Sequence, residues 1–158
     1  MLVAILHNIR SVHNVGSMFR TADGAGVLKL YLTGFTPTPV DRFGEFRKDL
    51  MKTSLGSERT VAWEFSRNPT RVFQKLKREG FALIALERAP NAVPYGAWPR
   101  TVNGKKKFAL IVGHEVGGLS PAMLNRADRV FDIPMRGKKE SLNVSVAFGI
   151  AVYELMKR

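Results

Sequence analysis

The sequence contains no cysteine, and its three histidines, His7, His13 and His114, are scattered along the chain. It can therefore form no disulfide bond and no thiolate metal site, and the histidine spacing does not indicate a zinc site. No apolar run reaches the roughly 18 residues that a membrane-spanning helix needs. The opening residues, MLVAILHN, lack the basic start and small-residue cleavage site of a signal peptide. These absences predict a cytoplasmic protein with no metal site and no membrane span.

The motifs of several common enzyme classes are also missing. The chain has no GxxxxGK followed by Ser or Thr, no GxGxxG between a strand and a helix, no GxSxG and no HExxH. This argues against P-loop, dinucleotide-binding, serine hydrolase and zinc protease chemistry. Only 13 residues are Asp or Glu, so neither paired-carboxylate glycoside hydrolysis nor Mg²⁺-dependent phosphoryl transfer is indicated.

Positive charge is what the sequence has in excess. Lys and Arg number 25, which gives a net charge of +12 and an isoelectric point near 10.5. Such an excess favours a polyanionic partner, most often nucleic acid. The alternative is a positive field that serves no function. The chain has two basic runs, residues 105–107 and Lys138 with Lys139. Contact with RNA and simple exposure to solvent are equally good interpretations of both runs.

Strand and helix patterns alternate along the 158 residues, which form a single domain. This alternation predicts an α/β fold with a parallel sheet, whose ligands bind beyond the carboxyl ends of the strands. The loops that begin at Glu87, Gly113 and Pro134 are such strand exits. The predicted strands are residues 2–7, 27–33, 60–65, 81–87, 107–112 and 129–133. Helices are predicted at residues 14–25, 68–78 and 121–126, with a short one within 41–57 and a last one opening near Ser141. Residues 88–106 form a proline-rich connection that crosses an edge of the sheet.

The last helix is apolar on nearly every side between residues 144 and 156. Surface helices normally keep a polar face, so this helix needs cover on two sides. One side can be its own sheet, and the other is most simply a second copy of the protein. Ser141, Asn143 and Ser145 stand out as polar residues at its start, where unpaired backbone N–H groups could hold a ligand.

Three stretches together resemble the motifs of the SpoU/TrmH family of RNA ribose 2′-O-methyltransferases, in the SPOUT superfamily. They are NVGSMFRTA at residues 14–22, IVGHEVGGLS at residues 111–120 and IPMRGKKESLNVSVA at residues 133–147. The resemblance implies a parallel-sheet fold with a C-terminal trefoil knot, which periodicity alone would not predict. It also implies a homodimer through the knot region and the last helix, S-adenosylmethionine as cofactor, and tRNA or rRNA as substrate. The chain looks like the catalytic domain without appended RNA-binding segments.

The resemblance assigns roles to particular residues. Those implied to bind the cofactor lie on three loops: Leu86, Gly113, Glu115, Gly117, Ile133, Met135, Ser141, Leu142 and Asn143. Those implied to act in catalysis are Arg20, Asn14, Glu115, Ser141 and Asn143. Without the resemblance, simpler interpretations hold: Asn14, Ser141 and Asn143 cap helices, Glu115 is a solvated acid, and Arg20 forms an ion pair on a helix surface.

Arg20 is the main catalytic candidate. Because a guanidinium stays protonated in proteins, binding a phosphate and stabilising the developing alkoxide suits it better than acting as a base. One residue departs from the family pattern, since the second motif has His114 where Asn is usual. If only the backbone at position 114 contacts the cofactor, the His side chain does no harm. If the usual Asn side chain has a role, His114 would change the cofactor affinity or the pH dependence of the reaction.

Two rival functions stay open at this point. One is an RNA-binding or RNA-folding factor with the same fold and no useful turnover, and the other is a SPOUT methyltransferase that modifies a base. The intact set of motif residues argues against the first, and Arg20 in the first motif argues against the second. RNA is favoured over DNA because only RNA has the 2′-hydroxyl.

Overall fold

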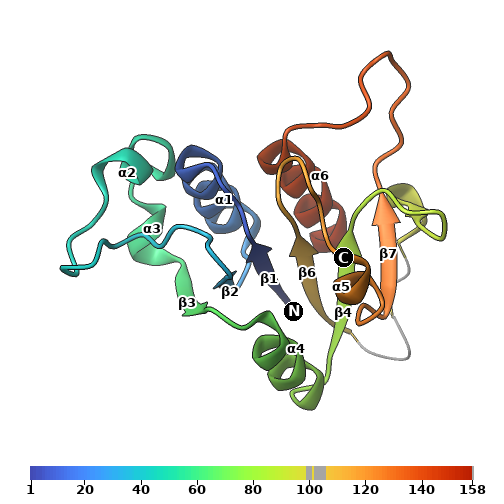
Figure 1. Ribbon diagram of the computed structural model, residues 1–158, viewed down its shortest axis with the longest axis horizontal. Coiled ribbons are helices and arrows are strands. Elements are labelled where there is room, and N and C mark those ends of the chain that lie inside the picture. The colour runs from blue at the N-terminus through green and yellow to red at the C-terminus, as the bar shows by residue number, and fades with distance from the viewer. Residues whose placement is uncertain (99–100, 102–105, 158) are drawn as a thin grey trace.

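A seven-stranded sheet, parallel throughout, runs through the centre of the protein, in the order β3-β2-β1-β6-β4-β7-β5 (Figure 1). The computed structural model describes residues 1–98, 101 and 106–157. The strands are β1 Leu2–His7, β2 Lys29–Thr33, β3 Ala62–Ser66, β4 Phe81–Leu86, β5 Val93–Pro94, β6 Lys107–Val112 and β7 Arg129–Asp132. The predicted α/β fold with a parallel sheet is confirmed.

Helices cover both faces of the sheet. They are α1 Val12–Ala25, α2 Lys48–Ser54, α3 Ser57–Thr60, α4 Pro69–Arg78, α5 Pro121–Leu124 and α6 Val144–Met156. Successive strand residues point to opposite faces, so Leu2, Ala4 and Leu6 of β1 join the core under α1 and α6. Val3 and Ile5 join the second core, under α4 and α5. The continuous apolar runs of the central strands therefore reflect burial on both sides.

Two helix starts differ from the sequence prediction. Ser11 caps α1, because its backbone is extended and its hydroxyl accepts the N–H of Asn14 at 3.3 Å. The prediction that Asn14 caps this helix is therefore wrong, and its side chain is available for other contacts. Asn143 caps α6 by accepting the N–H of Ser145 at 2.9 Å. Ser141 lies before the cap, so the helix starts later than predicted.

The proline-rich connection after β4 does run along an edge of the sheet. Its residues Val93–Pro94 form β5, which pairs with β7 as the outermost strand. Trp98 then stacks on Phe131, with ring centroids 4.1 Å apart and planes at 9°. A strand of two residues has too short a pattern to be recognised from sequence. Lys105, from the first basic run, lies outside the described residues.

The loops that follow β1, β6 and β7 gather at one edge of the sheet, at the top of Figure 1. The chain between β7 and α6 rises from this edge as a projecting arm, residues 133–143, defined here as the arm. The trefoil knot that the resemblance implies stays a prediction. Within the described ranges, no helix combines the length and apolar character that crossing a bilayer requires.

Candidate active site

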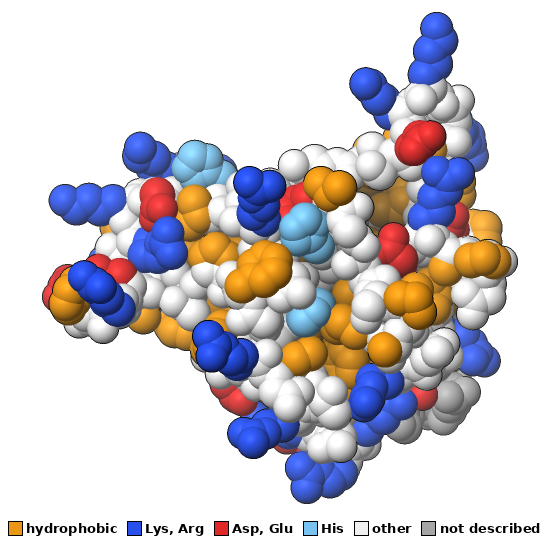
Figure 2. All heavy atoms as spheres, viewed as in Figure 1, with side chains coloured by type: hydrophobic (Ala, Val, Ile, Leu, Met, Phe, Trp, Pro, Cys, Tyr) orange, Lys and Arg blue, Asp and Glu red, His pale blue; other side chains and the backbone are white. Residues whose placement is uncertain are grey.

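A cavity of about 240 Å³ lies beyond the carboxyl ends of β4, β6 and β7. Figure 2 shows the surface hollowed beneath the arm, whose tip carries basic side chains. Three loops line the cavity, together with the first turns of α6. Eight of the nine predicted cofactor-binding residues are among its lining residues: Leu86, Gly113, Glu115, Gly117, Ile133, Met135, Ser141 and Leu142. The three loops predicted to converge do meet around this cavity, and their binding of the cofactor stays a prediction.

The loop after β6 is folded tightly back on itself. A Cβ atom on Gly113 would lie 2.7 Å from the carbonyl carbon of Gly118, so only glycine fits at this crossing. Gly118 itself has φ +59° and donates its N–H to the carbonyl of His114 at 2.9 Å. The glycines therefore create a compact turn whose backbone borders the cavity.

The side chain of His114 stabilises the same turn by hydrogen bonds to its backbone. Its Nδ1 accepts the backbone N–H groups of Val116 and Gly117, each at 3.0 Å. An Asn carboxamide oxygen can accept N–H groups two and three residues further on in the same way. The departure from the usual motif therefore keeps the acceptor that the turn needs. These two bonds place the ring's proton on Nε2 in the neutral form.

The side chain of Glu87 has a role in the site that the sequence analysis did not predict, although the loop that begins there was recognised. Glu87 follows β4 directly, and its Oε2 accepts the N–H of Leu119 at 2.8 Å, while Oε1 accepts the N–H of Arg88 at 3.0 Å. The carboxylate thereby ties the loop after β6 to the loop after β4, two walls of the cavity. Its position at the very end of a predicted strand, where a strand-exit loop begins, was the signal that could have identified it.

Glu115 connects the loop after β6 to the start of α1. Its Oε2 accepts the N–H of Arg10 at 2.9 Å, and its Oε1 accepts the N–H of Ser11 at 2.9 Å and Nδ2 of Asn14 at 3.0 Å. Burial raises the pKa of Glu115, but these hydrogen bonds outweigh burial and hold that pKa below its ordinary value. The carboxylate is therefore charged at neutral pH, and Glu115 is not a simple solvated acid.

Asn14 and Asn143 complete the cluster. Asn143 Nδ2 donates to Asn14 Oδ1 at 3.2 Å, while its own Oδ1 accepts both the N–H and the hydroxyl of Ser145. Residues more than 100 positions apart thus form one chain of hydrogen bonds, from Glu115 through Asn14 to the start of α6. Asn14 and Asn143 lie beside the cavity and are absent from its lining.

Arg20 is the one predicted site residue that the structure places neither in this cluster nor in the lining of the cavity. It is exposed and is not part of the cavity lining. It lies six residues beyond Asn14 on α1, about 9 Å further along the helix and about 240° around it. Gly24, one turn further on and on the same side of α1 as Arg20, has its Cβ position 3.2 Å from the hydroxyl oxygen of Tyr153 in α6. Arg20 therefore flanks α6 and does not face the cavity of its own chain.

The carboxylates near the cavity are not grouped as metal ligands. In the part of the chain that the structure describes, no three His, Cys, Asp or Glu side chains could hold a metal ion together. Glu87 and Glu115 are occupied with backbone N–H groups instead. The prediction of a site without a metal stays a prediction.

A parallel α/β sheet carries a glycine-lined cavity at its carboxyl edge, and the hydrogen-bonded cluster of Glu115, Asn14 and Asn143 lies beside it. This is the arrangement of an α/β enzyme that binds a small molecule at its strand ends. The model of the SpoU rRNA Methylase family matches residues 1–153. The chain belongs to this family. The match spans all three motifs, and the family assignment made from them is confirmed.

Known proteins resemble the chain in sequence and in structure. It is 33% identical over 157 residues to the tRNA (guanosine(18)-2′-O)-methyltransferase of Aquifex aeolicus, covering 99% of this chain and 69% of the relative. It is 30% identical to the 23S rRNA (guanosine-2′-O-)-methyltransferase RlmB of Xanthomonas axonopodis pv. citri, covering 99% of this chain and 59% of the relative. The chain thus spans less than two thirds of that second relative.

Two solved structures share the fold. The A. aeolicus TrmH/SpoU tRNA modifying enzyme has a TM-score of 0.81 and 31% identity, covering 99% of this chain and 74% of that one. The AdoMet-bound rRNA methyltransferase from Sinorhizobium meliloti has a TM-score of 0.84 and 26% identity, covering 98% of this chain and 55% of that one. Both likenesses extend over nearly the whole described sheet.

Proposed function

We propose that the protein transfers a methyl group from S-adenosylmethionine to a ribose 2′-hydroxyl of tRNA or rRNA. The observation that carries the proposal is the joining of three motifs, distant in sequence, around one cavity by the bonds among Glu115, Asn14 and Asn143. The names of the A. aeolicus and X. axonopodis relatives supply the reaction class and the two RNA classes. A cytoplasmic location fits a substrate of either class.

The lining of the cavity fits S-adenosylmethionine. Leu86, Ile133 and Leu142 supply apolar surface for a flat base, and the backbone of the three loops supplies polar groups for its edges. Glu87, Asp132 and Glu140 add negative charge to the same lining, which suits a sulfonium cation. Bound there, the cofactor supplies an electrophilic methyl carbon and accepts the electron pair of the broken C–S bond.

The contribution of the chain is chiefly positioning. Glu115 holds the start of α1 against the loop after β6, and Asn143 fixes the start of α6 through Asn14. We assign Ser141, exposed on the arm at the cavity, to orienting the ribose by hydrogen bonds from its hydroxyl. Fixed in this way, the 2′-oxygen can approach in line, and effective concentration accounts for much of the rate enhancement.

The protein is also proposed to act as a homodimer through α6. This helix buries Phe148, Ala151 and Leu155 in its own core, but it leaves Val146 51% and Tyr153 54% exposed. An apolar surface on one side of an otherwise buried helix is typical of a subunit interface. The predicted cover on one side by the sheet is confirmed, and the second copy on the other side is the proposal.

Arg20 is proposed to act at the active site of the partner subunit in the dimer. It is turned away from its own cavity and flanks the exposed side of α6, so an interface built on α6 brings it toward the partner subunit. There its guanidinium can bind a phosphate of the RNA and stabilise the negative charge that develops at the 2′-oxygen as the hydroxyl proton passes to solvent water. This arrangement explains why a motif residue lies outside the cavity of its own chain.

The experiment uses purified protein, methyl-labelled S-adenosylmethionine and separate pools of unmodified tRNA and rRNA, followed by digestion to nucleosides. Label in a 2′-O-methylnucleoside from one pool supports the proposal and identifies the RNA class. Label on a base would replace it with the base methyltransferase alternative. Cofactor binding with no label from either pool would favour the RNA-binding factor.

A further inference from the structure

A second hollow opens on the same edge of the sheet as the candidate active site. It is an open groove of about 900 Å³, lined mainly by the loop between β2 and α2. Asn8, Gly34 and Arg67, which line it, directly follow β1, β2 and β3. The groove therefore lies over one half of the sheet and the candidate active site over the other, and nothing in the proposed methyl transfer uses it.

Three phenylalanine rings line the groove and are open to solvent. Phe35 is 59% exposed, Phe43 is 74% exposed and Phe65 is 45% exposed. Large apolar side chains gathered at one exposed site are uncommon unless a ligand or partner covers them. Aromatic faces of this kind are stacking surfaces for unpaired bases, which bind to them with little dependence on sequence.

Arginines are interspersed with these rings. Arg42, Arg47 and Arg67 line the groove, and the one acid among the lining residues is Asp41. Asp41 is occupied locally, since its Oδ1 accepts backbone N–H groups two and four residues further on, at 2.8 and 3.0 Å. Figure 2 shows hydrophobic and basic side chains interspersed over this side of the molecule. Arg47 is paired with Asp49, so it is Arg42 and Arg67 that offer positive charge for phosphates next to flat apolar surface for bases.

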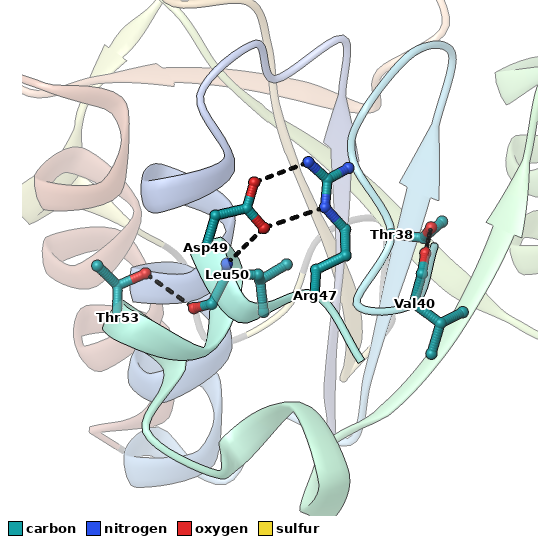
Figure 3. A network of polar contacts seen from close by, with 6 residues as sticks. All are labelled: Thr38, Val40, Arg47, Asp49, Leu50 and Thr53. Carbon is teal, nitrogen blue, oxygen red and sulfur yellow. Dashed lines mark hydrogen bonds and ion pairs between the residues drawn. The ribbon is translucent and has the colours of Figure 1, made fainter. Parts of the chain in front are cut away.

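The wall of the groove is braced before any ligand binds (Figure 3). Arg47 forms a fork with Asp49, with Nε to Oδ1 at 3.2 Å and Nη2 to Oδ2 at 2.9 Å. Asp49 Oδ1 also accepts the N–H of Leu50 at 2.9 Å. On the other side of the loop, Thr38 donates to the carbonyl of Val40 at 2.6 Å. These contacts hold the loop in place, which lowers the entropic cost of binding.

The groove and the candidate active site meet at one ring. Phe35 packs edge-on against His114, the residue that fastens the loop after β6, with ring centroids 6.0 Å apart at 79°. The backbone N–H of Phe35 is held by Asn8 Oδ1 at 3.2 Å. A chain of nucleotides lying in the groove would therefore continue directly onto the edge of the cavity.

We infer that this aromatic groove, defined by Phe35, Arg42, Phe43, Arg47, Phe65 and Arg67, binds an unpaired stretch of the RNA substrate and leads it to the active site. The inference rests on the proposed function and adds the structural class of the substrate. Base-paired RNA keeps its bases stacked and offers no free faces to the rings. The target ribose then lies in a loop, a bulge or a single-stranded end.

Fluorescence anisotropy with a labelled 12-nucleotide unpaired RNA, compared with the fully paired, blunt-ended duplex of the same strand, tests the inference. Phe43→Ala should weaken binding of the unpaired RNA by roughly 5- to 150-fold, since each stacked base contributes about 1–3 kcal/mol. The double variant Arg42→Gln/Arg67→Gln should reduce the slope of log affinity against log salt by about 1.4, because each phosphate contact to a single strand contributes about 0.7.

Matched controls come from the opposite edge of the sheet. Leu28, 53% exposed just before β2, serves as Leu28→Ala. Arg78 at the end of α4 and Arg126 before β7 serve as Arg78→Gln/Arg126→Gln, with the same loss of charge. Both controls should bind the unpaired RNA within twofold of the wild type, and every variant should keep its affinity for S-adenosylmethionine.

Several outcomes would overturn the inference: groove variants that bind like their controls, a wild type that does not bind unpaired RNA, or a fully paired duplex that binds as tightly. A change in oligomeric state without a change in RNA affinity would assign the groove to self-association instead. Methyl-transfer assays separate the two proposals. RNA binding through the groove without transfer would refute the proposed function alone, whereas full transfer by the groove variants would refute the groove alone.

Discussion

Replacing Glu115 by Gln tests whether its charge holds the candidate active site together. The carboxylate accepts three N–H groups, from Arg10 and Ser11 of the backbone and from Asn14. A carboxamide has one acceptor oxygen, so its NH₂ group would face one of these donors. Losing one charge-assisted bond and leaving its donor unpaired should cost about 1.5–3 kcal/mol of unfolding free energy.

Urea unfolding of Glu115→Gln and wild type measures this difference directly. Amide hydrogen exchange adds local detail, because protection at Arg10 and Ser11 should fall by roughly ten- to a hundredfold. Glu79→Gln is the matched control, since Glu79 is exposed and its carboxylate forms no hydrogen bond or ion pair within the described part of the chain. A Glu115→Gln variant as stable as this control, with unchanged protection, would refute the reasoning.

The pH dependence gives a second check with a definite sign. The pKa of Glu115 is lowered in the folded protein, so its stabilising contribution is fully present above the unfolded value of about 4.3. The contribution is lost as the pH falls through the folded pKa, because the protonated acid accepts these bonds poorly. The stability difference between wild type and Glu115→Gln should therefore be constant near neutral pH and shrink in acid. A difference that grew in acid would contradict the assignment.

Three further predictions follow from the same structure. His114→Asn should keep cofactor affinity within about threefold, because the amide oxygen can accept the same two N–H groups, whereas His114→Ala should weaken it by roughly tenfold or more by calorimetry. Val146→Glu should shift the protein from dimer to monomer in sedimentation with its circular dichroism unchanged, and a soluble wild-type monomer would rule out the interface. Arg20→Ala and Asn143→Ala should each be inactive, but mixing them should restore roughly a quarter of wild-type activity if Arg20 serves the partner's cavity; no restoration would place Arg20 at its own cavity.

Local patterns were sufficient for most of the fold. Runs such as the residues of β1 and β6 are buried on both faces, so their apolar character identifies them without reference to any neighbour. Pro69 and Asn68 mark the start of α4 as predicted, since each acts through its own turn. The strand β5 could not be predicted, because a two-residue strand is defined only by its partner β7.

The candidate site was predicted less completely than the fold. The motif loops were recognised, and eight predicted residues do line the cavity. Glu87 was missed because its role depends on the N–H of Leu119, which is distant in sequence. Asn14 was assigned a cap that Ser11 provides, since several polar residues near a helix start compete for that position.

By itself the sequence determined the alternation of strands and helices, the positive charge, the family and the loops that meet at the strand ends. These depend on residue type and short-range spacing, which a linear chain carries in full. Only the tertiary structure decided that Glu115 and Asn14, 101 residues apart, share a hydrogen bond, that Arg20 turns away from its own cavity, and that three phenylalanines and three arginines form one groove. Each of these depends on distances across the sheet, and such distances are set by packing and not by sequence spacing.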